Sequence, residues 1–441
     1  MTNLELKFSS IAALALVGGN ALFGCSVSAN AGDQSGAGNG GISKAGGANS
    51  SEAGSGDQSE GGSGDQSEAG SGGQSGAGNG AESEAGAAGA MDTSGGVLPF
   101  SPSNITLAGM DVSQVADQEL SQSCNIASGA DGAQGCFDGA VYVTQTQADG
   151  TKVNVVIVKS IHVEPQVHIH VTGSLPLVIV SLGDFSLLGT FDAAADGYDS
   201  GPGGFTALMA QAGFGPGGGP VGKNGHGAGG GSYCGLGGKG AVEFQTTSPA
   251  GAPTPAYGSE AIRPLIGGSS GGGGFFDAGA GGGAIQFVAG GKFTLGAAAY
   301  INVGGGGSSA AGATLYAGGG GGSGGSILIE GKTVQLAGLL AANGGGSGDG
   351  SDGNATPDTT PAPGGQAHYG DSTGGPGSAG ATINGSNATQ PTKEGGASGG
   401  GGGAGRIRIN SASGTVDLSN ATFSPAASTQ CVTQGSTGQG A

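Results

Sequence analysis

Strict alternation of apolar and polar residues begins near Val153 and is clearest in the stretch IHVEPQVHIHV, residues 161–171. Successive side chains of a β-strand point to opposite faces, so alternation places the apolar residues on one face. Pro165 interrupts the run, because proline cannot donate a ladder hydrogen bond. The pattern predicts two half-buried strands, with Ile161, Val163, Val167, Ile169 and Val171 inward and His162, Glu164, Gln166, His168 and His170 outward.

A second pattern repeats along the chain. The segment LPLVIVSLGDFSLLGTFDAAA, from Leu175, is echoed by segments that start at Ala284, Ser326 and Arg406. Each copy reads as an apolar strand, a short turn that contains Gly or Ser, and a second strand. A unit of about 20 residues cannot bury its own apolar face, but stacked copies can. We therefore expect Ile327, Ile329, Val334 and Leu336 to stack on Ile285, Phe287, Phe293 and Leu295, with Ile407 and Ile409 in the next copy.

Glycine-rich runs separate the copies, which predicts long insertions carried on one side of a stack of strands. Glycine has no Cβ, so chains can approach closely enough to hydrogen-bond laterally in a polyproline-II-like form. We expect the runs 217–231, 267–283 and 318–325 either to pack as a polyglycine layer or to be disordered. The predicted fold is all-β, a β-solenoid that resembles a right-handed parallel β-helix. A β-sandwich is the alternative, and FTALMAQAGF at 205–214 is the one weak helix candidate.

Composition narrows the class of protein further. Glycine accounts for 108 of 441 residues, without the strict third-residue period of collagen. Hydrophobic residues make up 35%, enough for a narrow core. The formal net charge is −19, which makes nucleic acids and anionic lipid surfaces poor partners.

The N-terminal segment predicts export. Residues 1–25 read as a secretory signal that ends in Leu22-Phe23-Gly24-Cys25, close to the lipobox in which the cysteine becomes acylated. Phe23 departs from that pattern, and Ala29-Asn30-Ala31 offers ordinary signal peptidase a competing site. We expect lipidation at Cys25, then a disordered, acidic Gly/Ser/Ala repeat tether over 26–97 and a folded body over 98–441.

Four further cysteines fit an exported protein, because disulfides persist outside the cytoplasm. No C-x-x-C motif is present, which argues against zinc and thioredoxin chemistry. Four cysteines allow three pairings. We predict the disulfides Cys124–Cys136 and Cys234–Cys431.

The order of these features resembles the glycine-rich surface lipoproteins of gliding soil bacteria. The resemblance rests on the lipobox, the tether, the SLPLVIVSLGDFSLLGTFDA segment and the blocks GGGGSGGSILIE and GGGGGAGRIRIN. It covers most of 98–441. It implies no assigned catalytic activity and no catalytic residues to transfer.

Several motifs suggest chemistry that their context does not support. GGGPVGKN at 217–224 lacks the strand, helix and Ser/Thr of a P-loop, and Ser323 in GGSGG lacks a nucleophile elbow. His168 and His170 share a strand face but read as exposed polar positions. The acidic loop around Asp349 and Asp352 misses the spacing of the calcium nonapeptide. We therefore predict no catalytic, cofactor-binding or metal-binding residue, no cofactor and no nucleotide partner.

The sequence thus favours a non-enzymatic, adhesin-like structural or interaction lipoprotein, anchored at the outer membrane or cell surface. Its expected partners are the membrane, through the lipid anchor, and surface polysaccharides or other surface proteins. Secretion without an anchor is the alternative location. A polysaccharide lyase or hydrolase on a β-helix is the alternative function, and it requires clustered carboxylates on neighbouring strands.

Overall fold

The computed structural model of the chain describes residues 97–246, 250–275, 278–308, 317–347, 353–366 and 371–438. Within these ranges the protein is all-β and contains no helix, as predicted for the class. The helix candidate at 205–214 is therefore wrong. The backbone N–H groups of Phe205 and Ala210 donate instead to the carbonyls of Gly268 and Gly274, in a neighbouring glycine run.

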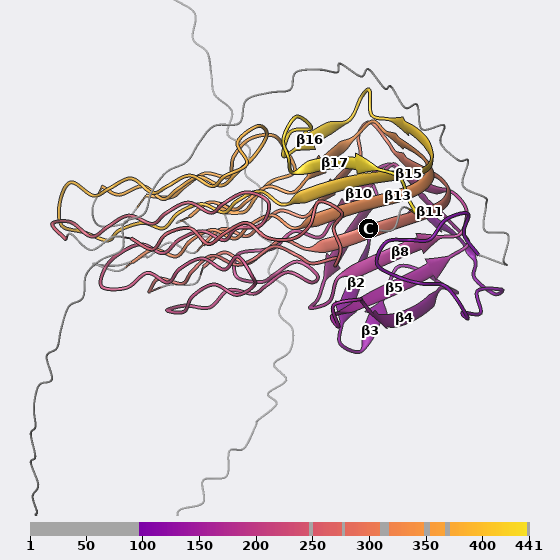
Figure 1. Cartoon of the computed structure of the whole chain (residues 1–441), viewed down its shortest axis with the longest axis horizontal. Coiled ribbons are helices and arrows are strands. Elements are labelled where there is room, and N and C mark those ends of the chain that lie inside the picture. Colours follow the sequence, from indigo (N-terminus) through magenta and orange to yellow (C-terminus); the bar gives the residue numbers. More distant parts are fainter. Residues whose placement is uncertain are drawn as a thin grey trace, which may run out of the picture. The chain divides into compact units, whose positions relative to one another are not determined.

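Two sheets organise the strands of the described residues (Figure 1). Sheet A holds β1 (Asp117–Leu120), β4 (Val141–Thr146), β5 (Lys152–Val158), β6 (Ser160–Val163), β8 (Leu177–Ser181), β9 (Phe185–Leu187), β11 (Ala284–Leu295), β13 (Ser326–Leu336), β15 (Arg406–Asp417) and β17 (Val432–Gly435). Sheet B holds β2 (Cys124–Gly129), β3 (Gly132–Gln134), β7 (His168–Thr172), β10 (Thr190–Asp192), β12 (Tyr300–Asn302), β14 (Leu339–Ala341) and β16 (Thr422–Ser424).

Pairing is parallel throughout both sheets except at the β2–β3 and β4–β5 hairpins. The predicted register of the repeats is confirmed, because Ile285, Phe287, Phe293 and Leu295 of β11 pair with Ile327, Ile329, Val334 and Leu336 of β13. Ile407 and Ile409 of β15 continue the same columns. This pairing differs from the antiparallel pairing of the β-sandwich alternative.

One apolar core lies between the two sheets. Phe287 of β11 contacts Phe185 of β9 edge to face at 5.4 Å and Phe191 of β10 at 4.9 Å, both between ring centroids. The alternating pattern of 161–171 is also confirmed: its five apolar side chains are buried, and its polar ones are exposed or partly exposed. Stacked repeats thus bury the faces that a single repeat leaves open.

Glycine-rich segments connect β10 to β11, β12 to β13 and β14 to β15, and Figure 1 shows them leaving the sheets on the same side. We call the hydrogen-bonded chains within 193–283, 303–325 and 342–405 the glycine bundle. Most of its described glycines are buried. The prediction that these runs pack together as a polyglycine layer is therefore confirmed for the described residues.

The hydrogen bonds of the glycine bundle repeat every three residues. Ala228 and Gly231 donate to Gly318 and Gly321; Gly318, Gly321 and Gly324 donate to Ala397, Gly400 and Gly403; and Gly400 and Gly403 donate back to Ala228 and Gly231. Three parallel chains thus form a closed cycle of donors and acceptors, with N···O distances of 2.9–3.0 Å. A three-residue period is that of the polyproline-II helix, whose successive N–H groups point to different neighbours.

Close approach explains why glycine is needed in the bundle. A Cβ on Gly321 would overlap the carbonyl oxygen of Gly345, and one on Gly402 would overlap that of Gly322. At one edge, side-chain amides complete the hydrogen bonding. The backbone N–H groups of Leu236, Lys239 and Val242 donate to the side-chain oxygens of Asn384, Asn387 and Gln390 respectively, at 2.7–2.8 Å.

Candidate functional site

The segment 98–112, which we call the strap, crosses the outer face of sheet A before β1 begins. Its Ile105 and Leu107 are buried against Val155 and Val178 of that face, and Leu98, Phe100, Met110 and Val112 pack beside them. Both faces of β5 and β8 are therefore covered, one by the inter-sheet core and the other by the strap. This coverage explains why KVNVVIV and LVIVS are almost continuously apolar.

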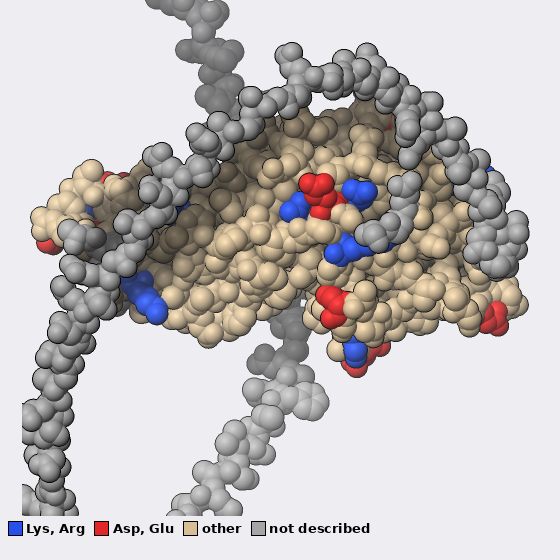
Figure 2. Space-filling view, viewed as in Figure 1, with Lys and Arg blue, Asp and Glu red and all other residues tan. Residues whose placement is uncertain are grey.

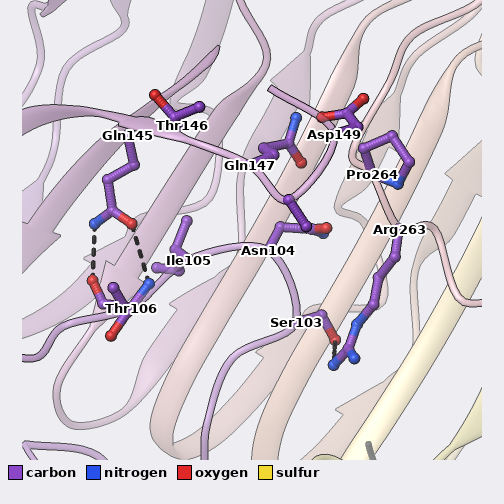
Figure 3. Close-up of a pocket in the computed structure, with 11 residues that line it drawn as sticks. Ser103, Asn104, Ile105, Thr106, Gln145, Thr146, Gln147, Asp149, Arg263 and Pro264 are labelled. Atoms are coloured by element: carbon purple, nitrogen blue, oxygen red, sulfur yellow. Dashed lines mark hydrogen bonds between the residues drawn. The ribbon is translucent and has the colours of Figure 1, made fainter. Parts of the chain in front are cut away.

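A cavity of about 560 Å3 lies between the strap, the turn that joins β4 to β5, and residues 263–264. We call it the strap pocket. It is lined by Ser103, Asn104, Ile105, Thr106, Gln145, Thr146, Gln147, Ala148, Asp149, Arg263 and Pro264 (Figure 3).

Two glutamines fix the walls of the strap pocket. The Gln145 side chain accepts from the N–H of Thr106 at 3.0 Å and donates to the carbonyl of Thr106 at 2.8 Å (Figure 3). Gln147 accepts from the N–H of Leu265 at 2.8 Å and donates to the carbonyl of Leu265 at 3.0 Å. Each carboxamide takes the place of a peptide group, so the turn is tied to the strap on one side and to 263–265 on the other.

Beneath the strap lies a fully buried carboxylate, Glu330 of β13. Its two oxygens accept four hydrogen bonds, from Ser103 N (2.9 Å), Ser103 Oγ (2.6 Å), Gln286 Nε2 (2.7 Å) and Asn410 Nδ2 (3.1 Å). These donors offset the cost of burying the carboxylate. Its hydrogen-bond partners on β11 and β15, Gln286 and Asn410, are amides, so this cluster offers one carboxylate rather than an acid–base pair.

Two arginines, Arg263 and Arg408, lie near this carboxylate. Arg263 donates from Nη2 to Ser103 Oγ at 2.9 Å (Figure 3), and that hydroxyl donates in turn to Glu330. Arg408 interacts electrostatically with Glu330 and Glu260; burial is the main cause that lowers the pKa of Arg408. Figure 2 shows that charged side chains are sparse on the visible face, and that acidic and basic side chains lie together near its middle.

Both predicted disulfides are present. Cys124 bonds to Cys136 at the start of the strand stack, and Cys234 bonds to Cys431 across 197 residues. The second bridge joins the glycine bundle to the residue before β17. Disulfides are typical of an oxidising compartment outside the cytoplasm. Cys25 and residues 26–96 of the predicted tether lie outside the described residues, and so do Asp349 and Asp352.

The other residues that the sequence singled out, and Arg406 at the start of β15, have structural roles or stay apart. Arg406 donates to the carbonyl of Tyr257 and lies over the ring of Tyr233. Ser323 Oγ accepts from the N–H of Ser269 inside the bundle. His168 contacts Thr190 Oγ1. Within the described ranges, no three His, Cys, Asp or Glu side chains gather to hold a metal ion.

Sequence reasoning missed Glu330, Arg263 and the strap pocket. A signal for Glu330 exists, because SILIE carries an acid at a position where the repeat is otherwise apolar or amide-bearing, as in AIQFV and RIRIN. Arg263 carried no comparable signal, since its partner Ser103 lies 160 residues away.

The chain matches no protein family model, no curated protein and no solved structure. None of the described segments forms a helix with the length and hydrophobicity that a membrane crossing requires.

Proposed function

We propose that this protein is a non-enzymatic, adhesin-like interaction lipoprotein, held at the cell surface through Cys25. The glycine bundle carries the proposal. Lateral hydrogen bonds on a three-residue period join its chains into a stiff projection from the sheets, which suits a part that presents a surface to the outside. The two disulfides support an extracellular setting.

We also propose that the body is a β-solenoid of the right-handed parallel β-helix type. Three successive repeats, β11–β12, β13–β14 and β15–β16, each place one strand in sheet A and one in sheet B in parallel register. Each repeat then acts as one coil, and the glycine bundle consists of the insertions between coils.

Fractionation of cells that express the full chain tests the anchor. We expect the wild-type protein in the membrane fraction, with an acylated N-terminus at Cys25 by mass spectrometry. Cys25→Ala should release the protein or stall its processing, whereas Cys124→Ala should leave it in the membrane fraction. An unmodified terminus at Gly32 would contradict the proposal.

Adhesion of whole cells tests the interaction role. Cells that display the wild-type chain should bind surface polysaccharide or neighbouring cells more than cells that express Cys25→Ala. Equal adhesion of the two strains would argue against it.

A further inference from the structure

The strap pocket contains an arginine, Arg263, that the fold orients but that forms no direct ion pair with any described residue. Ser103 holds the guanidinium of Arg263 by one hydrogen bond, and Glu330 fixes Ser103 from below. Glu330 already accepts four hydrogen bonds from other groups, so Arg263 is not required to satisfy it. The guanidinium is thus held in place while most of its donors remain available.

Those donors set the first requirement on a ligand. A guanidinium has five N–H donors, and among the described residues only its bond to Ser103 is formed. A planar, fixed fork of this kind matches the two oxygens of a carboxylate. The pocket therefore favours a ligand that carries a carboxylate group.

Two acceptors in the pocket set the second requirement. Asn104 uses both amide hydrogens, on Ile262 O at 3.0 Å and Gln286 Oε1 at 3.1 Å, which leaves its Oδ1 without a donor in the described part of the chain. The Oδ1 of Asp149 accepts from Thr151, and its Oδ2 accepts nothing from the described residues. A ligand that satisfies these oxygens must bring donors of its own, such as hydroxyl groups.

Together these requirements select among small ligands. Phosphate or sulfate would meet Arg263 but would place acceptor oxygens against Asn104 Oδ1 and Asp149. A neutral sugar would leave the guanidinium without an anion. The ammonium group of a free amino acid would have to lose water in order to pair with Asp149. The exposed position of Asp149 does not favour that loss. A sugar ring with one carboxylate and several hydroxyls can pair with Arg263, Asn104 and Asp149 together, and its C–H face can pack on Ile105 and Pro264.

We propose that the strap pocket binds one acidic sugar residue, of the uronic acid class, within a polysaccharide. The inference deepens the proposed function and rests on it for its biological setting. The cavity of about 560 Å3 falls within the range of small-ligand sites and is large enough for such a ring. Arg263 binds the carboxylate, while Asn104 and Asp149 accept from ring hydroxyls.

Isothermal titration calorimetry of the purified full chain tests this site with oligogalacturonate and oligoglucuronate as probes. Neutral galactose oligomers, sulfate and free glycine are the comparison ligands. We expect the uronates to bind and the comparison ligands to bind at least tenfold more weakly. Arg263→Gln should weaken uronate binding by about tenfold or more, because it removes a charge-assisted pair. Lys239→Gln, the same change of charge at an exposed site on the bundle, should leave the affinity unchanged.

A second variant keeps the test independent of the strap. Thr146 is exposed at the pocket and its side chain makes no hydrogen bond within the described ranges, so Thr146→Glu should keep the pairing of β4 with β5 and repel a bound carboxylate. We expect it to weaken uronate binding severalfold, more at low salt than at high salt. The proposal is overturned if the wild type fails to bind uronates, if neutral sugars or glycine bind equally well, or if Thr146→Glu binds as the wild type does. Calorimetry does not depend on acylation, so loss of the membrane anchor and loss of this site are read separately.

Discussion

Ser103 Oγ donates to Glu330 Oε1 across 2.6 Å, although 227 residues separate the two in sequence. The contact joins the strap to a central strand of sheet A. It fixes the strap over the outer apolar face and gives Arg263 an acceptor at the wall of the pocket. One hydroxyl group thus links the packing of the fold to the geometry of the candidate site.

Removal of that hydroxyl should destabilise the body. Ser103→Ala leaves the buried carboxylate of Glu330 with one donor fewer, at a cost of about 1–3 kcal/mol in the free energy of unfolding. Urea denaturation measures the change. Ser113→Ala, at an exposed turn where the hydroxyl donates to Asp111 and accepts a long hydrogen bond from Gln114, is the matched control and should change stability by less than about 0.5 kcal/mol. Equal effects of the two variants would contradict a special role for the strap contact.

A single methyl group in the glycine bundle should be costly. Gly321→Ala places a Cβ against the carbonyl oxygen of Gly345, and we expect a loss of about 1–3 kcal/mol or more from overpacking. Gly129→Ala is the control, because its Cβ meets nothing within 4 Å. Thermal unfolding of both variants measures the difference. If Gly321→Ala melts at the wild-type temperature, the close packing of these chains is wrong.

Truncation inside the stacked repeats should cost more than truncation at the surface. Ile329 is fully buried between Phe287 and Ile409 on the adjacent strands, so Ile329→Ala should lower the free energy of unfolding by about 2–5 kcal/mol. Leu208→Ala, at a side chain that is 46% exposed, should cost less than about 0.5 kcal/mol. Chemical denaturation compares the two, and an unchanged midpoint for Ile329→Ala would contradict the register.

The two disulfides should contribute unequally. In the chain-entropy account, a bridge across 197 residues restrains the unfolded chain by about 5 kcal/mol and one across 12 residues by about 3 kcal/mol. The pair Cys234→Ser and Cys431→Ser should therefore lower stability more than the pair Cys124→Ser and Cys136→Ser. Non-reducing peptide mapping checks the connectivity first. Four thiols that can be alkylated without reduction would refute both bridges.

Alkaline pH should lower the free energy of unfolding, because of two tyrosines in the glycine bundle. Burial raises the pKa of Tyr233 to about 12 and raises that of the stacked Tyr257 as well. Between pH 10 and 12 the unfolded chain loses the Tyr233 proton while the folded chain keeps it. The free energy of unfolding therefore falls with rising pH, by about 3 kcal/mol from Tyr233 alone.

Tyrosinate absorbance and denaturant midpoints across this range measure the alkaline effect. The variant Tyr233→Phe should lose less stability than the wild type as the pH rises, because it has no proton to lose at this position. An identical pH profile for the two proteins would show that Tyr233 does not titrate as described.

The sequence predicted those parts of the fold that depend on local periodicity. The columns through Ile329 and Phe287 follow from apolar spacing within each repeat. Compartment and even number indicate that the four cysteines pair, and the short separation of Cys124 and Cys136 selects one of the three connectivities. The strap pocket depends on tertiary contacts between segments more than 100 residues apart, such as Gln147 with Leu265. Such contacts leave no periodic trace, so Arg263 could not be recognised before the fold was known.

The cycle of three parallel chains in the glycine bundle restricts how the molecule can change in length over evolution. One extra residue in the chain that carries Gly318 and Gly321 would turn every later N–H by about a third of a revolution, away from its acceptor. Three extra residues would restore each donor to the same neighbour, about 9 Å farther along. Insertions and deletions in any one of these chains should therefore be tolerated in multiples of three residues, because only these preserve the pairing of donors with acceptors.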